Sequence, residues 1–400
     1  MKILYLHQYF VTPEMQGGTR SYEMAKRMVA AGHEVHIVTS SKDEGRACHE
    51  IIDGINVHWL PVLYDNKMNN IRRVIAFLQF AFLCGLKAKR IGGDIVFATS
   101  TPLTIVIPAL YAKWRLKIPM VFEVRDLWPE LPIAMGAINS RFLQWLAYKM
   151  EHIAYNCSEN VVGLSPGMCE GVAKTGYPPE RIHNIPNSCD NEFFAVPESA
   201  GELFRKKHKW LDGRPLIVYA GTFGRINGVC YLAELAEATY NIDPEIRFLA
   251  VGAGAEELKL LKKAKELGVY EKNFYMLPPV NKNEIPELLS AATVCCSLFI
   301  AVEEMWNNSA NKFFDALAAS KPVVINYGGW QKDIIETNVN GLVLGVDNMT
   351  QAAHKLIDFI NNEELVASAS CSSKFLAESE FSRDSLAEKL IGVLEMSVKS

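Results

Sequence analysis

Residues 2–38 read KILYLHQYFVTPEMQGGTRSYEMAKRMVAAGHEVHIV. The apolar run at residues 2–7 predicts a buried strand, and Gly17-Gly18 marks a loop. Ser21–Ala31 then has the periodicity of an amphipathic helix, and Val35–Val38 predicts a second strand. A strand–loop–helix–strand unit of this kind implies parallel pairing through a right-handed crossover.

The same alternation recurs along the chain. Further strands are expected at Asp94–Ala98, Pro119–Val124, Asn160–Ser165, Ile182–Ile185, Pro215–Ala220, Ile246–Val251, Phe274–Leu277, Thr293–Leu298 and Pro322–Asn326. Residues 190–213, with Asn, Pro, Gly and a charged helix at Arg205–Lys209, break the pattern and are predicted to be the linker and lead-in to the second domain.

We therefore predict an α/β protein of two doubly wound, Rossmann-like domains, residues 1–192 and 193–382. A C-terminal helix at about residues 383–400 is expected to pack back on the first domain. The length of 400 residues suits two domains. Doubly wound domains bind ligands at the carboxyl ends of their strands, so two of them are expected to face each other across a cleft that holds the site.

The composition favours a cytoplasmic protein without a metal. The nine cysteines are scattered, with no C-x-x-C pair, which is typical of reduced thiols. No group of His and Cys has the spacing of metal ligands. The chain opens without a signal-peptide pattern, and no apolar stretch has the length of a membrane-spanning helix.

Charge is unevenly distributed. The net charge is −4, yet residues 66–122 hold nine basic residues against one acidic residue, Asp94. Within this region Ile71–Leu86 is nearly all apolar and has basic flanks. A core helix is the commoner explanation, but such flanks also suit an element lying on anionic lipid. Nucleic acid is not expected, since no binding motif accompanies the charge.

Two glycine-bearing turns follow predicted strands in the second half. Gly221-Thr222-Phe223-Gly224 and Gly252-Ala253-Gly254 each precede a helix, where backbone N–H groups can approach an anion. Each is also compatible with a simple tight turn. Because position 257 is Glu, the dinucleotide fingerprint G-x-G-x-x-G is incomplete, which argues against a nicotinamide enzyme.

Residues 307–324, NNSANKFFDALAASKPVV, are more informative. A polar loop with capping residues opens a helix, and N–H groups near Ser309 and Asn311 would bind a diphosphate, with Lys312 as a point charge. Asp315, one turn later, would accept bonds from ribose hydroxyls. The alternative is an ordinary capped helix with Lys312 and Asp315 facing solvent.

This stretch resembles the donor-site helix of retaining glycosyltransferases of family four, which have the GT-B fold. The similarity spans nearly the whole chain and includes Gly17–Arg20, Glu123–Glu130, Leu164–Met168, Ile185–Asp190, Val218–Gly221 and Lys321–Val324. The form Asn311–Asp315 is similar to a WbuB-like branch, which is associated with bacterial O-antigen or capsule synthesis. Some members of that branch are assigned as N-acetyl-L-fucosamine transferases.

The resemblance implies how the donor is held. A UDP-sugar would bind the second domain, with its base near Val280 and its diphosphate near Gly221, Thr222 and Arg225. Gly17 and Gly18 would approach the distal phosphate or the sugar, unless they form a simple turn. No metal or other cofactor is implied, because Lys312 and helix N-termini would stabilise the leaving diphosphate.

The resemblance also implies an acceptor and a location. Asp126 would orient or deprotonate an acceptor hydroxyl, although it could instead form a structural pair with Arg125. His7, at the end of the first strand, is expected to be a satisfied buried histidine. The acceptor would be an undecaprenyl-diphosphate-linked saccharide, and the enzyme would lie on the inner face of the cytoplasmic membrane, with residues 66–122 against anionic lipid.

The chain departs from the family at four positions. Two glutamates eight positions apart are replaced by Asn307 and Asp315, and an Arg and a Lys by Thr222 and Asn227. Lys312 and Arg225 would then have to supply the positive charge. A UDP-sugar 2-epimerase of the same fold and a non-catalytic nucleotide-sugar binder are the alternatives, and a dehydrogenase is the weakest option.

Overall fold

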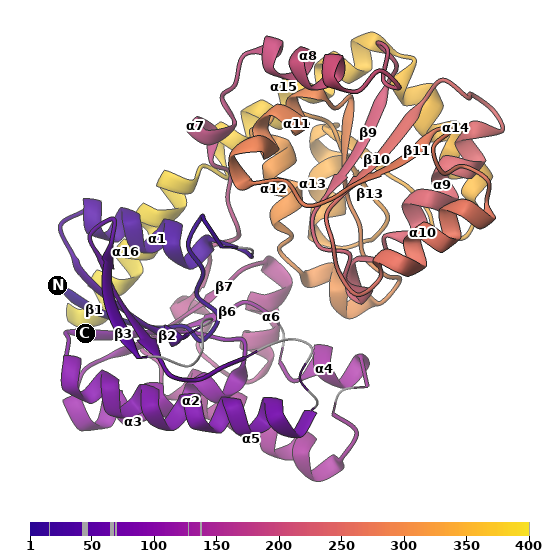
Figure 1. The fold of residues 1–400 in the computed structure, drawn as a ribbon. Coiled ribbons are helices and arrows are strands. Elements are labelled where there is room, and N and C mark those ends of the chain that lie inside the picture. The colour runs from indigo at the N-terminus through magenta and orange to yellow at the C-terminus, as the bar shows by residue number, and fades with distance from the viewer. Residues whose placement is uncertain are drawn as a thin grey trace. The chain divides into compact units, whose positions relative to one another are not determined.

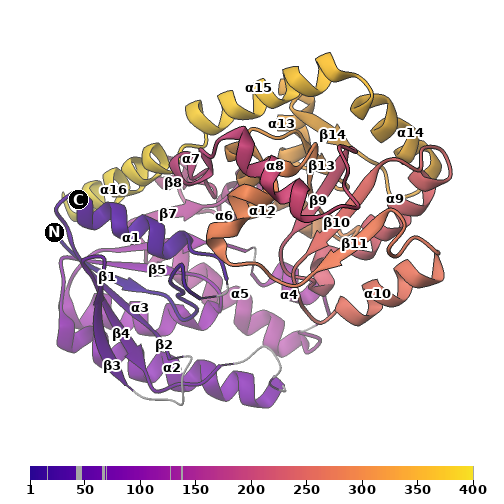
Figure 2. The ribbon, with the colours of Figure 1, turned by 45° about the horizontal axis from the view of Figure 1, so that its top comes forward.

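The computed structural model describes residues 1–15, 17–41, 47–64, 68, 70–126, 128–136 and 138–399. Lys67 of the basic region and Leu127 of the quoted motif lie outside these residues. The chain divides into two compact units (Figures 1 and 2). The first comprises Met1–Pro186, Asn307–Ser309 and Asp384–Ser400, and the second comprises Asn187–Trp306 and Ala310–Arg383.

The first unit is built on an eight-stranded sheet of order β3-β4-β2-β1-β5-β6-β7-β8. All neighbours pair in parallel except β3 and β4. The strands are β1 (Lys2–Leu6), β2 (Glu34–Ser40), β3 (Cys48–Ile52), β4 (Ile55–Leu60), β5 (Ile95–Thr99), β6 (Met120–Val124), β7 (Asn160–Gly163) and β8 (Ile182–Asn184).

Helices cover both faces of this sheet. Its principal helices are α1 (Arg20–Ala30), α2 (Asn70–Ile91), α3 (Val106–Leu116), α4 (Glu130–Ala134), α5 (Arg141–Asn156), α6 (Pro166–Lys174) and α16 (Arg383–Lys399). Ile3 and Tyr5 of β1 share a core cluster with residues of α1 and α16. Leu4 and Leu6 share another with residues of α2, α3 and α5. This division follows from the alternation of side chains along a strand.

The antiparallel pair of β3 and β4 was not predicted from the sequence. Most of β3 is exposed, so it lacks the buried alternation that marks the other strands. A signal was nevertheless present in Asp53-Gly54, which joins the two strands. Both residues have left-handed φ, 46° and 80°, as a tight hairpin turn requires.

The second unit has a six-stranded parallel sheet of order β11-β10-β9-β12-β13-β14. Its strands are β9 (Leu216–Ala220), β10 (Arg247–Val251), β11 (Phe274–Leu277), β12 (Val294–Ser297), β13 (Val323–Ile325) and β14 (Gly341–Val343). The order reverses between β9 and β12, which is the switch point where doubly wound sheets bind ligands. The prediction of two doubly wound α/β domains is confirmed.

The helices of the second unit include two in residues 190–213, where a linker and lead-in with one charged helix at Arg205–Lys209 had been predicted. They are α7 (Asn191–Phe194) and α8 (Glu198–Lys207), and α8 packs against α11. The others are α9 (Cys230–Tyr240), α10 (Glu257–Glu266), α11 (Ile285–Ala291), α12 (Asn311–Ala318), α13 (Trp330–Asn338), α14 (Met349–Ile360) and α15 (Glu363–Ser379).

Candidate functional site

The two glycine loops of the second unit pack against each other at the carboxyl ends of β9 and β10. Gly221 N–H donates to Val251 O at 2.9 Å, and Phe223 N–H donates to Ala253 O at 2.9 Å. Gly252 has φ +151°, and a Cβ there would lie 1.9 Å from Gly221 O. Any side chain at Gly252 would therefore separate the loops.

Lys312, in the first turn of α12, lies directly over the first of these loops. A Cβ on Gly221 would come within 2.4 Å of Lys312 Cε, so the absence of a side chain at Gly221 makes room for the lysine. Lys312 Nζ donates to Asn227 Oδ1 at 3.4 Å and sits 5.2 Å from the centroid of the Tyr219 ring. Burial lowers the pKa of Lys312 to about 8. The side chain is thus half-buried and packs on the glycine loop.

Asn227 and Thr222 form the base of this arrangement. Asn227 is buried, and its Nδ2 donates to Thr222 O at 2.9 Å. Tyr219 Oη also donates to Thr222 O, at 2.8 Å. Asn227 thus orients both the loop and Lys312.

The start of α12 differs from the prediction in its cap. The N-cap residue is Ala310, which provides no side-chain capping bond, whereas a polar cap had been expected. Ser309 is buried and Asn311 is exposed. The positive end of this helix thus begins one residue before Lys312.

Asp315 follows Lys312 by one turn on α12 and is half-buried. Burial raises the pKa of its carboxyl to about 6, although the nearby cations Arg383, Lys282 and Lys312 act in the opposite direction. The carboxylate is therefore mainly ionised at neutral pH and can accept hydrogen bonds from hydroxyl groups.

The remaining residues predicted to bind the donor lie along the same edge of the sheet. Arg225 is exposed in the short 3-10 helix Arg225–Asn227, which follows the first glycine loop. Val280 is half-buried in the segment after β11. The structure thus brings Gly221, Thr222 and Lys312 together and leaves Arg225 at the surface.

Asp126 lies in the first unit, directly after the carboxyl end of β6. Thr101 Oγ1 donates to Asp126 Oδ2 at 3.0 Å. Burial raises the pKa of Asp126, and the Thr101 hydrogen bond and the charge of Arg125 partly offset this. Arg125 directs its guanidinium to His7 Nε2 at 3.2 Å and Ser21 Oγ at 3.4 Å, so the described contacts do not show the alternative Arg125–Asp126 pair.

His7 is buried, as predicted, but it is only half satisfied. Its Nε2 contacts Arg125, whereas Nδ1 has no hydrogen-bond partner among the described residues. Burial, aided by the charge of Arg125, holds the pKa of His7 well below its usual range. The ring is therefore neutral at physiological pH.

Gly17 and Gly18 are exposed in the loop between β1 and α1. Gly17 has φ +138°, and a Cβ there would lie 3.3 Å from Val11 Cγ2. A backbone conformation of this kind favours glycine. The loop thus presents backbone without side chains at the carboxyl end of β1.

A buried ion pair at the start of α1 was not predicted from the sequence. Arg20 Nε donates to Glu123 Oε1 at 3.0 Å, and Thr99 Oγ1 donates to Glu123 Oε2 at 2.7 Å. Arg20 also donates to the carbonyl oxygens of Ile185 and Pro186, at 2.8 and 2.5 Å. These bonds tie the start of α1 to β6 and to the segment after β8, and they tie β6 to β5. A single Glu within the apolar strand β6 was the available signal.

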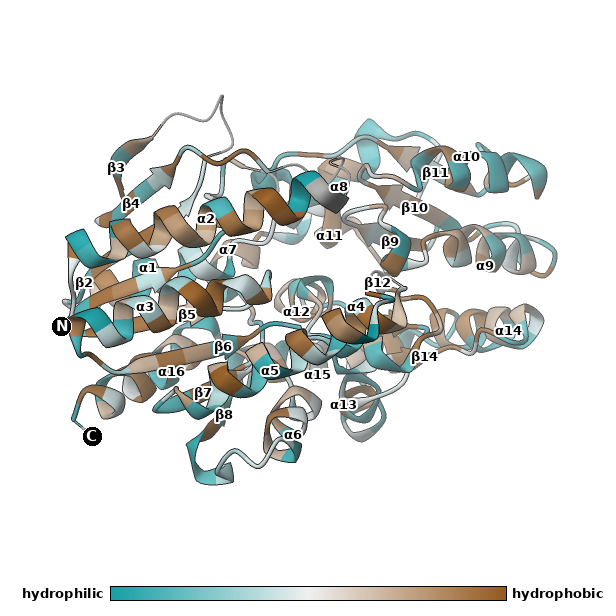
Figure 3. Cartoon of the chain, turned by 90° about the horizontal axis from the view of Figure 1, so that it is seen from below, coloured by the Kyte–Doolittle hydropathy of each residue, from teal (hydrophilic) through white to brown (hydrophobic). Residues whose placement is uncertain are grey.

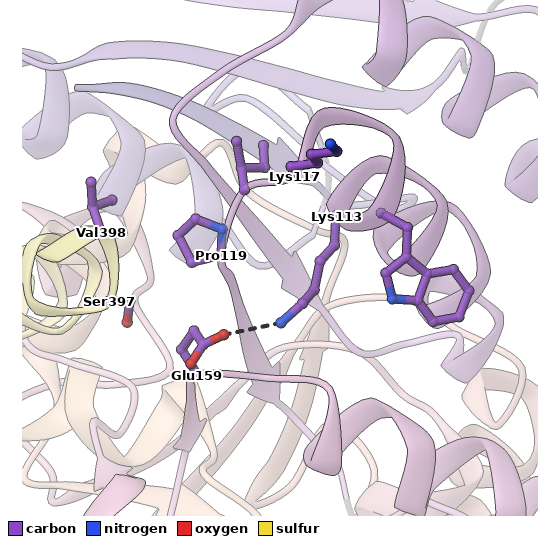
Figure 4. A pocket seen from close by; sticks show the side chains of 8 residues that line it. Lys113, Lys117, Pro119, Glu159, Ser397 and Val398 are labelled. Carbon is purple, nitrogen blue, oxygen red and sulfur yellow. Dashed lines mark hydrogen bonds and ion pairs between the residues drawn. The ribbon is translucent and has the colours of Figure 1, made fainter. Parts of the chain in front are cut away.

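A pocket of about 420 Å³ lies at the opposite, amino-terminal edge of the first sheet (Figure 4). Its lining includes Lys113, Lys117, Pro119, Glu159, Ser397 and Val398. Lys113 Nζ is held by Glu159 Oε1 at 3.0 Å and by Cys157 O at 2.7 Å. The pocket is therefore separate from Asp126, which follows β6 at its other end.

Two protein families match the chain, one in each unit. Residues 17–188 match the family described as Glycosyl transferase 4-like domain, and residues 201–375 match Glycosyl transferases group 1. With the glycine loops and Lys312 at the switch point, these matches define the class of protein: a glycosyltransferase of the GT-B fold. In this chain a glycosyl transferase 4-like domain is followed by a domain of the glycosyl transferases group 1 family.

Curated relatives carry related descriptions at low identity. A GDP-mannose-dependent alpha-mannosyltransferase from Mycobacterium tuberculosis is 22% identical over 87% of this chain and 84% of its own. A putative colanic acid biosynthesis glycosyl transferase, WcaI from Escherichia coli, is 22% identical over 72% of this chain and 74% of its own. Spore coat protein SA from Bacillus subtilis is 24% identical over 46% of this chain, which spans only half of that protein.

Among solved structures, Alr3699/HepE from Anabaena in complex with UDP has a similar fold. The TM-score is 0.74 at 16% sequence identity, over 99% of this chain and all of the other.

Proposed function

We propose that this glycosyltransferase moves a sugar, with retention of configuration, from a UDP-sugar to a lipid-linked saccharide in bacterial surface polysaccharide synthesis. One observation carries the proposal: Lys312 is a half-buried cation packed over Gly221, which has no side chain, at the amino end of α12. A cation held beside a helix N-terminus is suited to a diphosphate.

The donor would place its diphosphate at Gly221 and Lys312. Its ribose would contact Asp315, and its base would lie near Val280. Uridine is favoured because Alr3699/HepE was crystallised with UDP, but the guanosine donor named for the mycobacterial relative makes GDP the alternative to test. Gly17 and Gly18 would approach the distal phosphate or the sugar.

Transfer would proceed on one face of the sugar. The leaving phosphate would help to take the acceptor proton, and Lys312 and the N-terminus of α12 would stabilise the charge that develops on it. Asp126 would orient the acceptor hydroxyl, and its raised pKa places it closer to the range of a general base. Because these groups supply positive charge, we propose that turnover needs no divalent cation.

The sugar and acceptor are proposed on resemblance. The WbuB-like form of Asn311–Asp315 favours an amino sugar such as N-acetyl-L-fucosamine, and the colanic acid description of WcaI supports surface polysaccharide synthesis. The acceptor would be linked to undecaprenyl diphosphate at the inner face of the cytoplasmic membrane. Among the described residues no helix is long and apolar enough to cross a bilayer. The basic residues of region 66–122 would instead attract anionic lipid.

Product analysis tests this function. The protein is incubated with UDP-N-acetyl-L-fucosamine and other UDP-sugars, with and without undecaprenyl-diphosphate-linked saccharides, and products are analysed by NMR. Acceptor-dependent release of UDP, with the anomeric configuration of the donor kept, is expected with or without a chelator. Conversion of the donor alone would indicate an epimerase, and binding without turnover a non-catalytic protein.

A further inference from the structure

Three helices of the first unit lie on the same face of its sheet. The inner sides of α2, α3 and α5 contribute to one core cluster. Both α2 and α5 also pack against α3, so the three outer sides adjoin one another. A Cβ on Gly85 of α2 would lie 3.2 Å from the ring of Tyr111, which shows how closely α2 approaches α3. We call this outer surface the three-helix face (Figure 3).

The outer side of α2 is an apolar stripe. Val74, Leu78, Phe82 and Leu86 follow one another at the i, i+4 spacing of one helix face, and they are 37–67% exposed. Ala76, Phe80, Cys84 and Ala88, on the inner side, are buried. This helix is therefore apolar on both sides, although only one of them contacts the core.

The first two turns of α5 are apolar in almost every direction. Phe142, Leu143, Trp145 and Leu146 are 40–67% exposed, and the rings of Phe142 and Trp145 stack at 6.0 Å. Trp114 of α3 is also exposed. Single exposed apolar residues are ordinary, but a gathering of large ones over adjoining helices marks an interaction surface.

The charges of the three-helix face all have one sign. The described parts of α2, α3 and α5 carry nine Arg and Lys residues. Their one acidic residue, Glu151, is buried. The exposed charges of these three helices are therefore all positive, although Lys113 is paired with Glu159. Arg72, Lys89 and Arg90 lie at the ends of the apolar stripe of α2. The positive charges of this surface suit an anionic partner, and its exposed apolar side chains suit a partner with an apolar interior.

We propose that the three-helix face inserts into the headgroup–acyl boundary of an anionic lipid bilayer. The first two turns of α5 and the outer stripe of α2 are the inserted elements, and the basic residues contact lipid phosphates. This deepens the membrane partner of the proposed function, because α5 lies outside region 66–122 and insertion goes beyond electrostatic attraction. A second copy of the chain fits less well, since a symmetric contact would bring two uniformly positive surfaces together.

Vesicle flotation tests the insertion. The full chain is mixed with vesicles of phosphatidylcholine containing phosphatidylglycerol, or of phosphatidylcholine alone. It is expected to float with the anionic vesicles at low salt. Part of this binding is expected to persist at about 1 M salt, where the Debye length falls to about 3 Å and purely electrostatic adsorption is lost.

Matched variants locate the inserted side chains. Phe142→Glu and Phe82→Glu are each expected to weaken partition to anionic vesicles about tenfold or more, from the lost burial of one large apolar side chain. Phe375→Glu, on α15 of the second unit, serves as the control because Phe375 is 64% exposed, close to the 67% of Phe142 and Phe82. Partition of the control is expected to match that of the unmodified chain.

Three results would overturn the insertion: vesicle binding that Phe142→Glu and Phe82→Glu leave unchanged, no binding by the unmodified chain, or a dimer in solution that Phe142→Glu dissociates. Far-UV circular dichroism and a cooperative thermal transition like that of the unmodified chain show that each variant remains folded. Because UDP binding concerns the second unit, failure of UDP binding with intact vesicle binding would remove the proposed function and leave the lipid surface standing.

Discussion

The depressed pKa of Lys312 predicts a pH-dependent affinity for UDP. In the free protein burial lowers this pKa to about 8, whereas a bound diphosphate would favour the charged form and raise it. Binding is therefore coupled to protonation of Lys312. Between pH ~7 and ~9, above the range in which Asp315 titrates, affinity should fall as pH rises through the pKa of Lys312 in the free protein.

The magnitude follows from the protonated fraction. With a pKa of about 8, Lys312 is about nine-tenths protonated at pH ~7 and about one-tenth protonated at pH ~9. The Kd for UDP should therefore rise about tenfold over this interval, which corresponds to about 1.4 kcal/mol. Lys312→Arg keeps its charge throughout and should abolish the pH dependence. Lys312→Met should bind weakly at both pH values, without the tenfold change.

Lys312→Met is expected to have opposite effects on UDP affinity and on the stability of the free protein. A lysine pKa lowered from 10.5 to about 8 by folding means that the charged form opposes folding; because the side chain is only half-buried, the cost is at most about 3 kcal/mol at pH ~7. This penalty is fully present at pH values below both pKa values and is relieved as pH rises between them. Lys312→Met should therefore raise the Tm of the free protein by several degrees while it weakens UDP binding.

Isothermal titration calorimetry with UDP measures both affinity and proton uptake. In buffers of different ionisation enthalpy at pH ~8, about half a proton should be taken up per UDP bound, as a group with that pKa requires. Affinity that stays constant between pH ~7 and ~9 would refute the reasoning. So would an equal decline in Lys312→Met, because the titrating group would then lie elsewhere.

Three further predictions concern other ionisable side chains: Arg20, His58 and Asp315. Arg20→Met leaves Glu123 buried without its partner and should lower the free energy of unfolding, measured in urea, by about 3–5 kcal/mol. Adding Glu123→Gln to the same chain should recover part of this loss. A loss below about 1 kcal/mol would contradict the role of the pair. Burial lowers the pKa of His58 to about 3, so the unfolded chain binds the extra proton between pH ~3 and ~6.5. The free energy of unfolding should therefore fall as the pH is lowered across that window, by at most about 1.4 kcal/mol per pH unit. His58→Gln should reduce this dependence of the unfolding free energy on pH, measured by urea titrations. An unchanged dependence would argue that His58 is not the group responsible. Asp315→Asn should weaken UDP binding about tenfold by calorimetry but leave 2′,3′-dideoxy-UDP unaffected, and an equal loss for both nucleotides would exclude the ribose contact.

Local sequence patterns were sufficient for the architecture. Strand–helix alternation predicted two doubly wound domains because apolar runs of strand length between amphipathic helices have few other stable arrangements. The Gly221 and Gly252 turns were also visible in the sequence, since each follows a predicted strand directly. The hairpin at Asp53-Gly54 was missed because an exposed strand lacks the buried alternation on which the other predictions relied.

The spacing of residues along the sequence could not predict which side chains of the site are buried or what they contact. From its spacing Lys312 could have extended into solvent, and only the structure shows that it packs over Gly221, beside Tyr219 and Asn227. Arg20 and Glu123 are 103 positions apart, so their pairing depends on how α1 and β6 pack. Charge burial of this kind is a tertiary property, which a single sequence does not display.

Thermal unfolding with UDP, GDP, ADP and NAD in turn tests most directly whether the second unit holds a nucleoside diphosphate at Gly221 and Lys312. Ligand at about a hundred times its Kd stabilises the folded state by about 2.7 kcal/mol, which raises Tm by several degrees for domains of this size. We predict a rise with UDP that Lys312→Met largely abolishes. A rise with NAD alone, or a UDP effect that Lys312→Met leaves intact, would contradict the account.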